Sequence, residues 1–259
     1  MPRKIKPVFQ VFHPLVFNCA ELGNPMQIAD FMNIVPKINE AEFGFGKGGF
    51  IMKRAAENPD KIFVAVEAVP SLCLRAYEKA CSKKLANLYL VLGDARLFFS
   101  HYLRDTKLDT INFLFPDPWH KSRYHKHRMV TDKTVPYLAK ILKNTGRVVV
   151  RSDNHIVAFD IMTNLLNCGF VLGKMHWNED NSIAYTEWES KAIVNGRKIL
   201  HCEFEIPENF VQPELSPIFD IRQVNFRNYS DGKIKILGNI DNADSSSRNA
   251  LPIPEFLLH

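Results

Sequence analysis

Short apolar runs alternate with amphipathic segments along most of the chain. Apolar runs bounded by turn residues are typical of buried strands, and seven of them lie at 34–43, 62–66, 88–92, 111–115, 147–151, 170–177 and 198–206. Segments with the periodicity of a helix lie at 50–56, 71–84, 131–143 and 155–167. Strands that alternate with helices predict a doubly wound, mostly parallel α/β sheet of seven strands.

The two ends of the chain differ from this middle part. Residues 1–20 are first basic and then apolar, which is typical of an arm that packs onto a domain or touches nucleic acid. From Pro207 onwards prolines recur, 225–237 has the pattern of a hairpin, and 239–249 is polar. We therefore expect an N-terminal arm and lead-in over 1–33, a central domain over 34–206, and a C-terminal extension over 207–259.

Composition narrows the class of protein. The 259 residues are enough for one large domain, and 46% hydrophobic with 24% charged residues is ordinary for a globular protein. The five cysteines are scattered and form no C-x-x-C pair, so we expect reduced thiols in a cytoplasmic protein rather than disulfides or a zinc knuckle. No apolar run approaches the roughly 20 residues of a membrane span, and we expect neither a membrane segment nor a signal peptide.

Acidic residues recur at one position relative to the predicted strands. Four of them lie at or just past the carboxyl ends of consecutive strands: Glu42, Glu67, Asp94 and Asp117. The carboxyl ends of parallel strands meet at one edge of a sheet, which is where open α/β sheets bind ligands. The spacing therefore predicts one site along that edge.

A glycine-rich turn separates the first of these strands from the helix that follows. It reads Glu42-Phe43-Gly44-Phe45-Gly46-Lys47-Gly48-Gly49, and glycines there let a backbone approach a ligand at which the helix N–H groups point. The glycines at 44, 46 and 49 match the G-x-G-x-x-G pattern of dinucleotide sites. Counted from Glu42, the turn also matches the E-x-G-x-G-x-G pattern typical of S-adenosylmethionine sites. Both cofactor classes remain open at this point.

Two of the acidic residues suit either cofactor. Glu67 follows the glycine turn by roughly 20 residues, where its two oxygens can accept both hydroxyls of a ribose. Asp94, which Ala95 follows, can accept a hydrogen bond from the amino group of adenine.

The predicted strand 111–115 ends at Pro116-Asp117-Pro118-Trp119, and a basic run follows. The prolines hold Asp117 on a stiff turn, because proline fixes its own φ and restricts the residue before it. The basic run contains His120, Lys121, Arg123, His125, Lys126, His127 and Arg128, with Tyr124 among them. Cations interleaved with an aromatic residue beside a site indicate contact with RNA. The histidines have no acidic or thiol partner at ligand spacing, so we expect no metal.

These motifs resemble the tRNA (guanine-N7)-methyltransferase family of the TrmB type. The residues that carry the likeness are EFGFGKGGF at 42–50, VAVEAV around Glu67, FPDPWHKSRYHKHR at 115–128, SDN at 152–154 and TEWE at 186–189. For residues 34–206 the resemblance implies the fold of class I S-adenosylmethionine-dependent methyltransferases. It implies S-adenosylmethionine as cofactor, tRNA as partner, and methyl transfer to N7 of a guanine in the variable loop. A monomer, a homodimer and a complex with a partner subunit remain open.

Carried over by position, the resemblance implies roles for individual residues. It implies a cofactor site formed by Glu42, Gly44, Gly46, Glu67, Asp94, Ala95 and Asp117. It implies a guanine site formed by Lys121, Asp153, Thr186 and Glu189. It implies tRNA contact through Arg123, Tyr124, His125, Lys126, His127 and Arg128.

The chemistry of guanine explains why the reaction needs no general base. N7 carries a free lone pair in the plane of the ring, so it can attack a methyl carbon without first losing a proton. The remaining tasks are alignment, which supplies roughly 7–11 kcal/mol in well-oriented reactions, and stabilisation of the positive charge that develops on the base. Asp117 is the candidate catalytic residue for the second task, because prolines fix it. Asp153 and Glu189 suit the N1–H and amine of guanine, and Lys121 suits O6 or a phosphate.

Three other interpretations use parts of the same pattern. An NAD(P)-dependent oxidoreductase accounts for the glycine turn and Glu67, but it leaves the basic run without a role and needs a proton relay that the sequence does not show. A non-catalytic RNA-binding module with a degenerate site requires loss of the acidic residues at the strand ends, yet all four are present. A methyltransferase with a protein or small-molecule acceptor fits the glycine turn alone.

Overall fold

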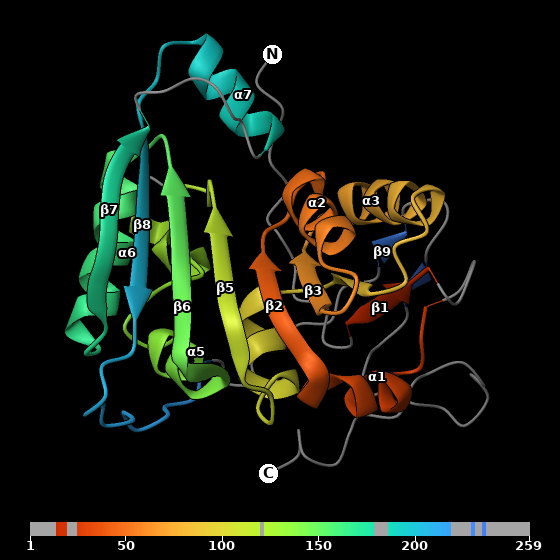
Figure 1. The fold of residues 1–259 in the computed structure, drawn as a ribbon, viewed down its shortest axis with the longest axis horizontal. Helices are drawn as coiled ribbons and strands as arrows, with labels where there is room; N and C mark the ends of the chain where they lie inside the picture. The colour runs from red at the N-terminus through yellow and green to blue at the C-terminus, as the bar shows by residue number, and fades with distance from the viewer. Residues whose placement is uncertain are drawn as a thin grey trace.

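A mixed sheet forms the centre of the computed structural model, which describes residues 14–19, 25–119, 122–178, 186–218, 229–230 and 235–236. Figure 1 shows this sheet, whose strands follow the order β1-β4-β3-β2-β5-β6-β8-β7. The strands are β1 (Leu15–Asn18), β2 (Ile38–Phe43), β3 (Ile62–Glu67), β4 (Leu88–Leu92), β5 (Leu108–Leu114), β6 (Leu142–Ser152), β7 (Val171–Asn178) and β8 (Ile199–Glu205).

Five neighbouring strands, β2 to β6, run parallel to one another. β8 is antiparallel to both β6 and β7. The prediction of a doubly wound, mostly parallel sheet is confirmed, but the predicted strand number is wrong, because the sheet has eight strands. The additional strand is β1, which pairs antiparallel with β4 and buries Val16 and Phe17. Its four residues are too few to show a periodicity, and pairing along the β4 edge is what makes them a strand.

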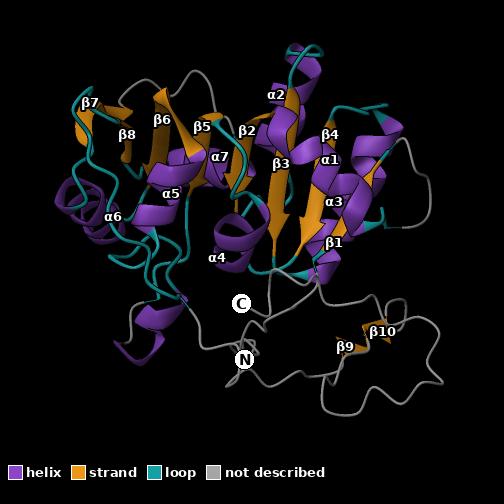
Figure 2. Ribbon diagram, turned by 90° about the horizontal axis from the view of Figure 1, so that it is seen from below, coloured by secondary structure: helices purple, strands orange, loops and turns teal. Residues whose placement is uncertain are grey.

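Helices cover both faces of the sheet (Figure 2). They are α1 (Ile28–Ile34), α2 (Gly49–Glu57), α3 (Pro70–Ser82), α4 (Ala95–Leu97), α5 (Val135–Ile141), α6 (His155–Asn167) and α7 (Glu187–Val194), with short 3₁₀ helices at Val35–Lys37 and Ser122–His127 and a π-helical turn at Phe98–Tyr102. The apolar side chains form two clusters. One joins α2 and α3 to β3 and β4, and the other joins α1, α5, α6 and the π turn to the opposite face. Alternate residues of β3 enter different clusters: Phe63 belongs to the first and Val64 to the second.

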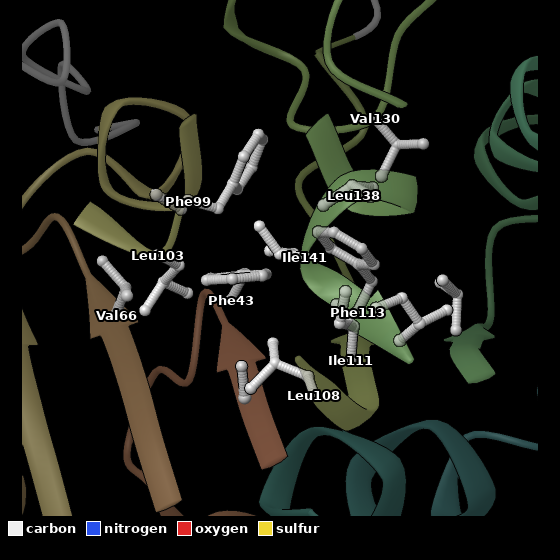
Figure 3. Close-up of a cluster of buried hydrophobic side chains, with 14 of the residues drawn as sticks. Phe43, Val66, Phe99, Leu103, Leu108, Ile111, Phe113, Val130, Leu138 and Ile141 are labelled. Atoms are coloured by element: carbon white, nitrogen blue, oxygen red, sulfur yellow. The ribbon is translucent and has the colours of Figure 1, made fainter. Parts of the chain in front are cut away.

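The second cluster packs beneath the point where the strand order reverses, between β2 and β5 (Figure 3). The ring centroids of Phe43 on β2 and Phe113 on β5 lie 5.6 Å apart, and Phe99 contacts Phe43 edge-on at 5.3 Å. All three side chains are buried. This packing fixes the carboxyl ends of β2 and β5. Glu42 lies near the end of β2, and the turn that carries Asp117 follows β5.

Two predicted boundaries were wrong around residue 140. The predicted helix 131–143 exists only as α5, and the residues expected to close it, Asn144 to Gly146, are part of strand β6. Pro136 in the first turn of α5 suits a helix start. A Cβ atom on Gly146 would lie 2.7 Å from the carbonyl oxygen of Leu108, so glycine permits close pairing with β5. By contrast, the helix predicted over 155–167 matches α6.

The chain beyond β8 packs back onto the domain as far as residue 218. The Tyr137 hydroxyl donates to the carbonyl of Ser216 at 2.9 Å, and the amide of Gln212 donates to the carbonyl of Pro136 at 2.9 Å. Within the predicted hairpin, the short strands β9 (Tyr229–Ser230) and β10 (Lys235–Ile236) pair antiparallel. The N-terminal arm over 1–13 and the segment 239–249 lie outside the described residues. The division into three parts stays a prediction.

Candidate active site

A cavity of about 750 Å³ lies at the carboxyl ends of the central strands. The strand order reverses between β2 and β5, and such switch points are where doubly wound sheets bind ligands. The four acidic residues predicted at strand ends all line this cavity: Glu42, Glu67, Asp94 and Asp117. The sheet therefore brings together residues that are as much as 75 positions apart in the sequence (42 to 117).

The glycine turn forms one wall of the cavity. Gly44, Gly46 and Gly48 have φ values of 81°, 57° and 69°, in the left-handed region that side chains other than glycine rarely adopt. A Cβ atom on Gly46 would meet nothing within 4 Å, so the backbone is open there. The turn thus presents bare backbone to the cavity at the start of α2, as a cofactor cradle requires.

Glu42 lies at the base of the cavity with 2% of its surface exposed. Its Oε2 atom has no hydrogen-bond partner within the described residues. Burial raises the pKa of Glu42 well above its ordinary value, and the nearby carboxylates of Glu40 and Glu67 raise it further, while the backbone N–H of Ile51 lowers it. A buried carboxyl that lines a cavity and has one unsatisfied oxygen fits a ligand that carries a positive charge.

Glu67 is held by the backbone on both sides. Its Oε2 accepts from the N–H of Gly46 at 2.9 Å, and its Oε1 accepts from the N–H of Val69 at 3.0 Å. Burial raises its pKa, and these hydrogen bonds oppose that rise. The carboxylate is therefore oriented before any ligand binds, and each oxygen keeps a further lone pair that can accept a hydroxyl.

Asp94 is bound to Arg96, a partner that the sequence did not reveal. Its Oδ1 accepts from the backbone N–H of Arg96 at 2.9 Å and from Nε at 3.0 Å, while Nη2 donates to Oδ2 at 2.6 Å. Both side chains are about nine-tenths buried, with 9% exposed. Asp94 thereby caps the short helix α4, and Ala95 and Arg96 line the cavity beside it.

Asp117 lies on a strained turn. Phe115 and Trp119 have φ values of 52° and 39°, which cost energy for residues other than glycine. The N–H of Phe115 donates to the carbonyl of Arg151 at 2.7 Å, which ties the turn to β6. The Asp117 side chain is open to the cavity, yet the surrounding protein removes enough water to raise its pKa. The predicted rigid carboxylate is therefore on the cavity wall.

The basic run divides into inward and outward residues. Arg128 points inward: its Nη1 lies 2.9 Å from Oδ2 of Asp160 on α6, and its side chain is 16% exposed. Arg123, Tyr124 and His125 are exposed, and the Arg123 guanidinium lies over the Tyr124 ring at 4.8 Å. The structure thus does not place Arg128 with the outward residues expected to contact tRNA.

Two aromatic residues of this loop lie at the cavity. His127 and Trp119 both line the cavity, with ring centroids 5.0 Å apart. Trp119 packs within the loop, against Tyr124 and His127. Lys121 and the side chain of Lys126 lie outside the described residues.

The residues expected around guanine occupy two depths. Thr186 lines the cavity and caps α7, where its hydroxyl accepts from the N–H of Glu189 at 3.0 Å. Glu189 is fully buried, and its Oε1 lies 2.7 Å from Nη2 of Arg151 at the end of β6. Asp153 accepts from Arg197 at 2.7 Å and is 3.5 Å from Nε1 of Trp188. Neither Glu189 nor Asp153 is among the residues that line the cavity.

Helix α7 lies above the carboxyl ends of the central strands (Figure 1), and several of its residues line the cavity. Lys47 of the glycine turn forms an ion pair of 2.7 Å with Glu187 of α7. Sequence reasoning missed this contact and the Arg151–Glu189 pair. A signal for the second exists: an arginine that ends an apolar strand must be paired if the strand is buried.

Comparison with known proteins identifies the family. The model of the Methyltransf_4 family of methyltransferases matches residues 37–202. A tRNA (guanine-N(7)-)-methyltransferase of Mycoplasmopsis pulmonis is 30% identical over 184 residues, which cover 68% of this chain and 89% of that protein. The chain belongs to the tRNA (guanine-N7)-methyltransferase family. A family member from Chlamydia felis is 32% identical over 61% of this chain and 71% of its own length.

The extent of the match varies within the family. A member from Aquifex aeolicus is 38% identical over 116 residues, but the aligned part spans only 39% of that protein and 45% of this chain. Among solved structures, the 16S rRNA methyltransferase KamB has a TM-score of 0.54 at 17% identity and covers 69% of this chain and 94% of its own. An antibiotic-related methyltransferase has a TM-score of 0.53 at 16% identity, covering 73% and 98%. These likenesses confirm the predicted fold of class I methyltransferases.

The residues that the structure describes contain no group of three or more His, Cys, Asp or Glu side chains arranged to hold a metal ion. None of the helices among them is both long and apolar enough to cross a membrane.

Proposed function

We propose that this protein transfers a methyl group from S-adenosylmethionine to N7 of a guanine in tRNA. The observation that carries the proposal is the cavity at the strand-order switch, where the glycine turn and four acidic residues converge. Membership of the tRNA (guanine-N7)-methyltransferase family supports it. We propose further that the acceptor lies in the variable loop and that the reaction takes place in the cytoplasm.

The cavity residues suit the parts of this cofactor. Glu42, with its unsatisfied oxygen, would hold the positively charged methionine end beside the open backbone of Gly46. Glu67, already oriented by two backbone N–H groups, would accept the ribose hydroxyls. Asp94 and Ala95 would face the adenine. When bound, S-adenosylmethionine supplies a methyl group activated by a positively charged sulfur.

The residues of this chain then need to orient the base and stabilise charge. Guanine N7 attacks with its own lone pair, so no side chain has to take a proton. Positive charge develops on the purine, and Asp117 on its fixed turn can stabilise it through an oriented negative charge. Because the pKa of Asp117 is raised, this carboxylate loses its charge at a higher pH than an exposed aspartate would.

Recognition of the substrate is proposed at two levels. Thr186 on the cavity wall and Lys121 would contact the guanine, with Asp153 and Glu189 near them. The exposed residues Arg123, Tyr124 and His125, together with Lys126 and His127, would contact the tRNA.

The test is methyl transfer from labelled S-adenosylmethionine to tRNA that lacks 7-methylguanosine, with identification of the product nucleosides by mass. We expect 7-methylguanosine from the wild type and a loss of roughly 10²–10³-fold in kcat for Asp117→Ala, the usual cost of removing an oriented charge stabiliser. Cofactor binding by the same variant, measured by calorimetry, separates lost catalysis from lost binding. Wild-type protein that binds S-adenosylmethionine but leaves tRNA unmodified would refute the proposed substrate.

A separate measurement tests the cofactor. Thermal unfolding is followed with S-adenosylmethionine and, in parallel, with NAD(P). A ligand that binds the native state raises the midpoint, so we expect a rise with S-adenosylmethionine alone. A rise with NAD(P) alone would favour an oxidoreductase instead.

A further inference from the structure

A buried ion pair joins helix α7 to the sheet. Arg151, near the carboxyl end of β6, and Glu189, in the first turn of α7, lie 2.7 Å apart with 6% and 0% of their side chains exposed. Charges are costly to remove from water unless they are paired, and breaking such a pair by removing one partner leaves an uncompensated buried charge. The pair therefore constrains where α7 can lie.

Helix α7 has few other means of attachment. Of its eight residues, only Glu189 and Ala192 are buried, and Trp188 and Val194 are 54% and 86% exposed. A helix of this length depends on tertiary contacts for its stability. Other contacts that join α7, or Arg197 just after it, to the body are polar and more exposed: Lys47 with Glu187, Trp188 with Asp153, and Arg197 with Asp153. Exposed pairs contribute little to stability, so the buried pair is the principal anchor.

The position of α7 matters because its first turns form part of the cavity wall. Thr186, Glu187, Trp188, Ser190 and Lys191 line the cavity. Thr186 is held in place by the N–H of Glu189 itself, at 3.0 Å. Whatever holds Glu189 therefore also holds Thr186 at the cavity.

We propose that Arg151 is a positioning residue, and that Glu189 serves methyl transfer by anchoring α7 to Arg151 rather than by touching the guanine. This inference rests on the proposed function, because its readout is methyl transfer. Arg151 thereby gains a role. Glu189 supports the part of the cavity wall that contains Thr186 instead of contacting the substrate. The reason is that Glu189 is fully buried and is not among the residues that line the cavity.

The test replaces the charges by apolar side chains of similar size. Arg151→Met and Glu189→Leu are compared singly and together, with Arg197→Met as a control that removes the exposed pair. Each single variant should have a lower thermal midpoint and a KM for tRNA raised roughly tenfold or more, because it removes one partner of a buried ion pair. The affinity for S-adenosylmethionine should change less, since the acidic residues proposed to bind it lie on or just after β2 to β5. Arg197→Met should stay close to wild type.

The double variant decides between anchor and contact. An apolar pair can replace a buried ion pair without loss of stability, so the anchor predicts that Arg151→Met/Glu189→Leu regains both the thermal midpoint and most of the methyl transfer. A double variant that regains stability but stays inactive would show that the Glu189 carboxylate meets the substrate, and would overturn the proposal. If the double variant does not fold, Arg151→Lys, which keeps a charge for Glu189, should retain more activity than Arg151→Met; equal losses would also overturn it. A wild type that makes no 7-methylguanosine at all would instead refute the proposed function.

Discussion

At the scale of single residues, the cavity combines carboxyl groups in different states. Asp94 is neutralised by Arg96, whereas Glu42, Glu67 and Asp117 have no cation at this short range among the residues that the structure describes. Burial raises the pKa of Glu42, Glu67 and Asp117. Carboxylates gathered around one cavity repel each other unless a positive charge enters. A cationic ligand relieves that repulsion, so its binding and the ionisation of these groups should be coupled.

Glu42 gives the clearest prediction of this coupling. In the unfolded chain it ionises near a pKa of about 4.3, while the folded protein keeps its proton to a higher pH. The unfolded state then binds fewer protons than the native state, so the free energy of unfolding of the ligand-free protein falls as the pH rises through this window. Glu42→Gln should make that fall shallower, as measured by thermal midpoints across the pH range, and it should weaken binding of S-adenosylmethionine. Glu67 and Asp117 should keep part of the slope; identical pH profiles for the two proteins would contradict the prediction.

At the scale of elements, the turn between β2 and α2 is where local backbone geometry serves the site. Gly48 has a φ of 69° and is the residue before the first turn of α2, while its neighbour Gly49 begins the helix without a positive φ. Two glycines side by side in the sequence are thus under different constraints. The difference can be measured.

Gly48→Ala should lower the free energy of unfolding by about 1–2 kcal/mol, because a left-handed conformation is costly for alanine. Its new Cβ would also lie 2.9 Å from Cε of Met52, a flexible side chain that can move. Gly49→Ala is the matched control: its Cβ would meet nothing within 4 Å, so stability should be unchanged or higher. Denaturant unfolding of both variants checks this, and equal losses would show that the turn imposes no strain.

At the scale of the whole molecule, the basic run serves two purposes in one stretch of sequence. Arg128 joins the loop to α6 through Asp160, and its Nη2 lies 3.1 Å from Nε2 of His125 and 3.4 Å from the carbonyl of Pro118, beside Asp117. Arg123 stacks on Tyr124 at the surface. One arginine supports the fold around Asp117 and the other faces solvent, where tRNA would bind.

Arg123→Met and Arg128→Met should therefore fail in different ways. Loss of Arg123 should weaken tRNA binding without changing the thermal midpoint. The slope of log affinity against log salt concentration should become less steep by about 1, the value for one lost phosphate contact. Loss of Arg128 should lower the midpoint and leave the salt slope nearly unchanged. Filter binding over a range of salt concentrations, together with thermal unfolding, distinguishes the two. A less steep salt slope for Arg128→Met with an unchanged thermal midpoint would show that Arg128 contacts the tRNA instead.

The sequence by itself determined the order of seven strands and of four helices between them, the edge of the sheet that carries the site, and the family, but it did not predict α4 or α7. Apolar runs, glycine turns and proline breaks are local signals, and an acidic residue at each strand end is brought to one edge by any parallel sheet. Strand β1 was missed because it carries no such local signal. Its four residues acquire their conformation from pairing with β4.

Only the tertiary structure decided which charged residues face the cavity and which hold the walls. Asp117 and Glu189 come from motifs of the same family, yet one is open to the cavity and the other is buried against Arg151. Arg123 and Arg128 differ in the same way. The physical reason is that a charge becomes structural when a partner from another element meets it inside the protein. Such partners can lie far away in the chain: Arg151 and Glu189 are 38 positions apart (151 to 189).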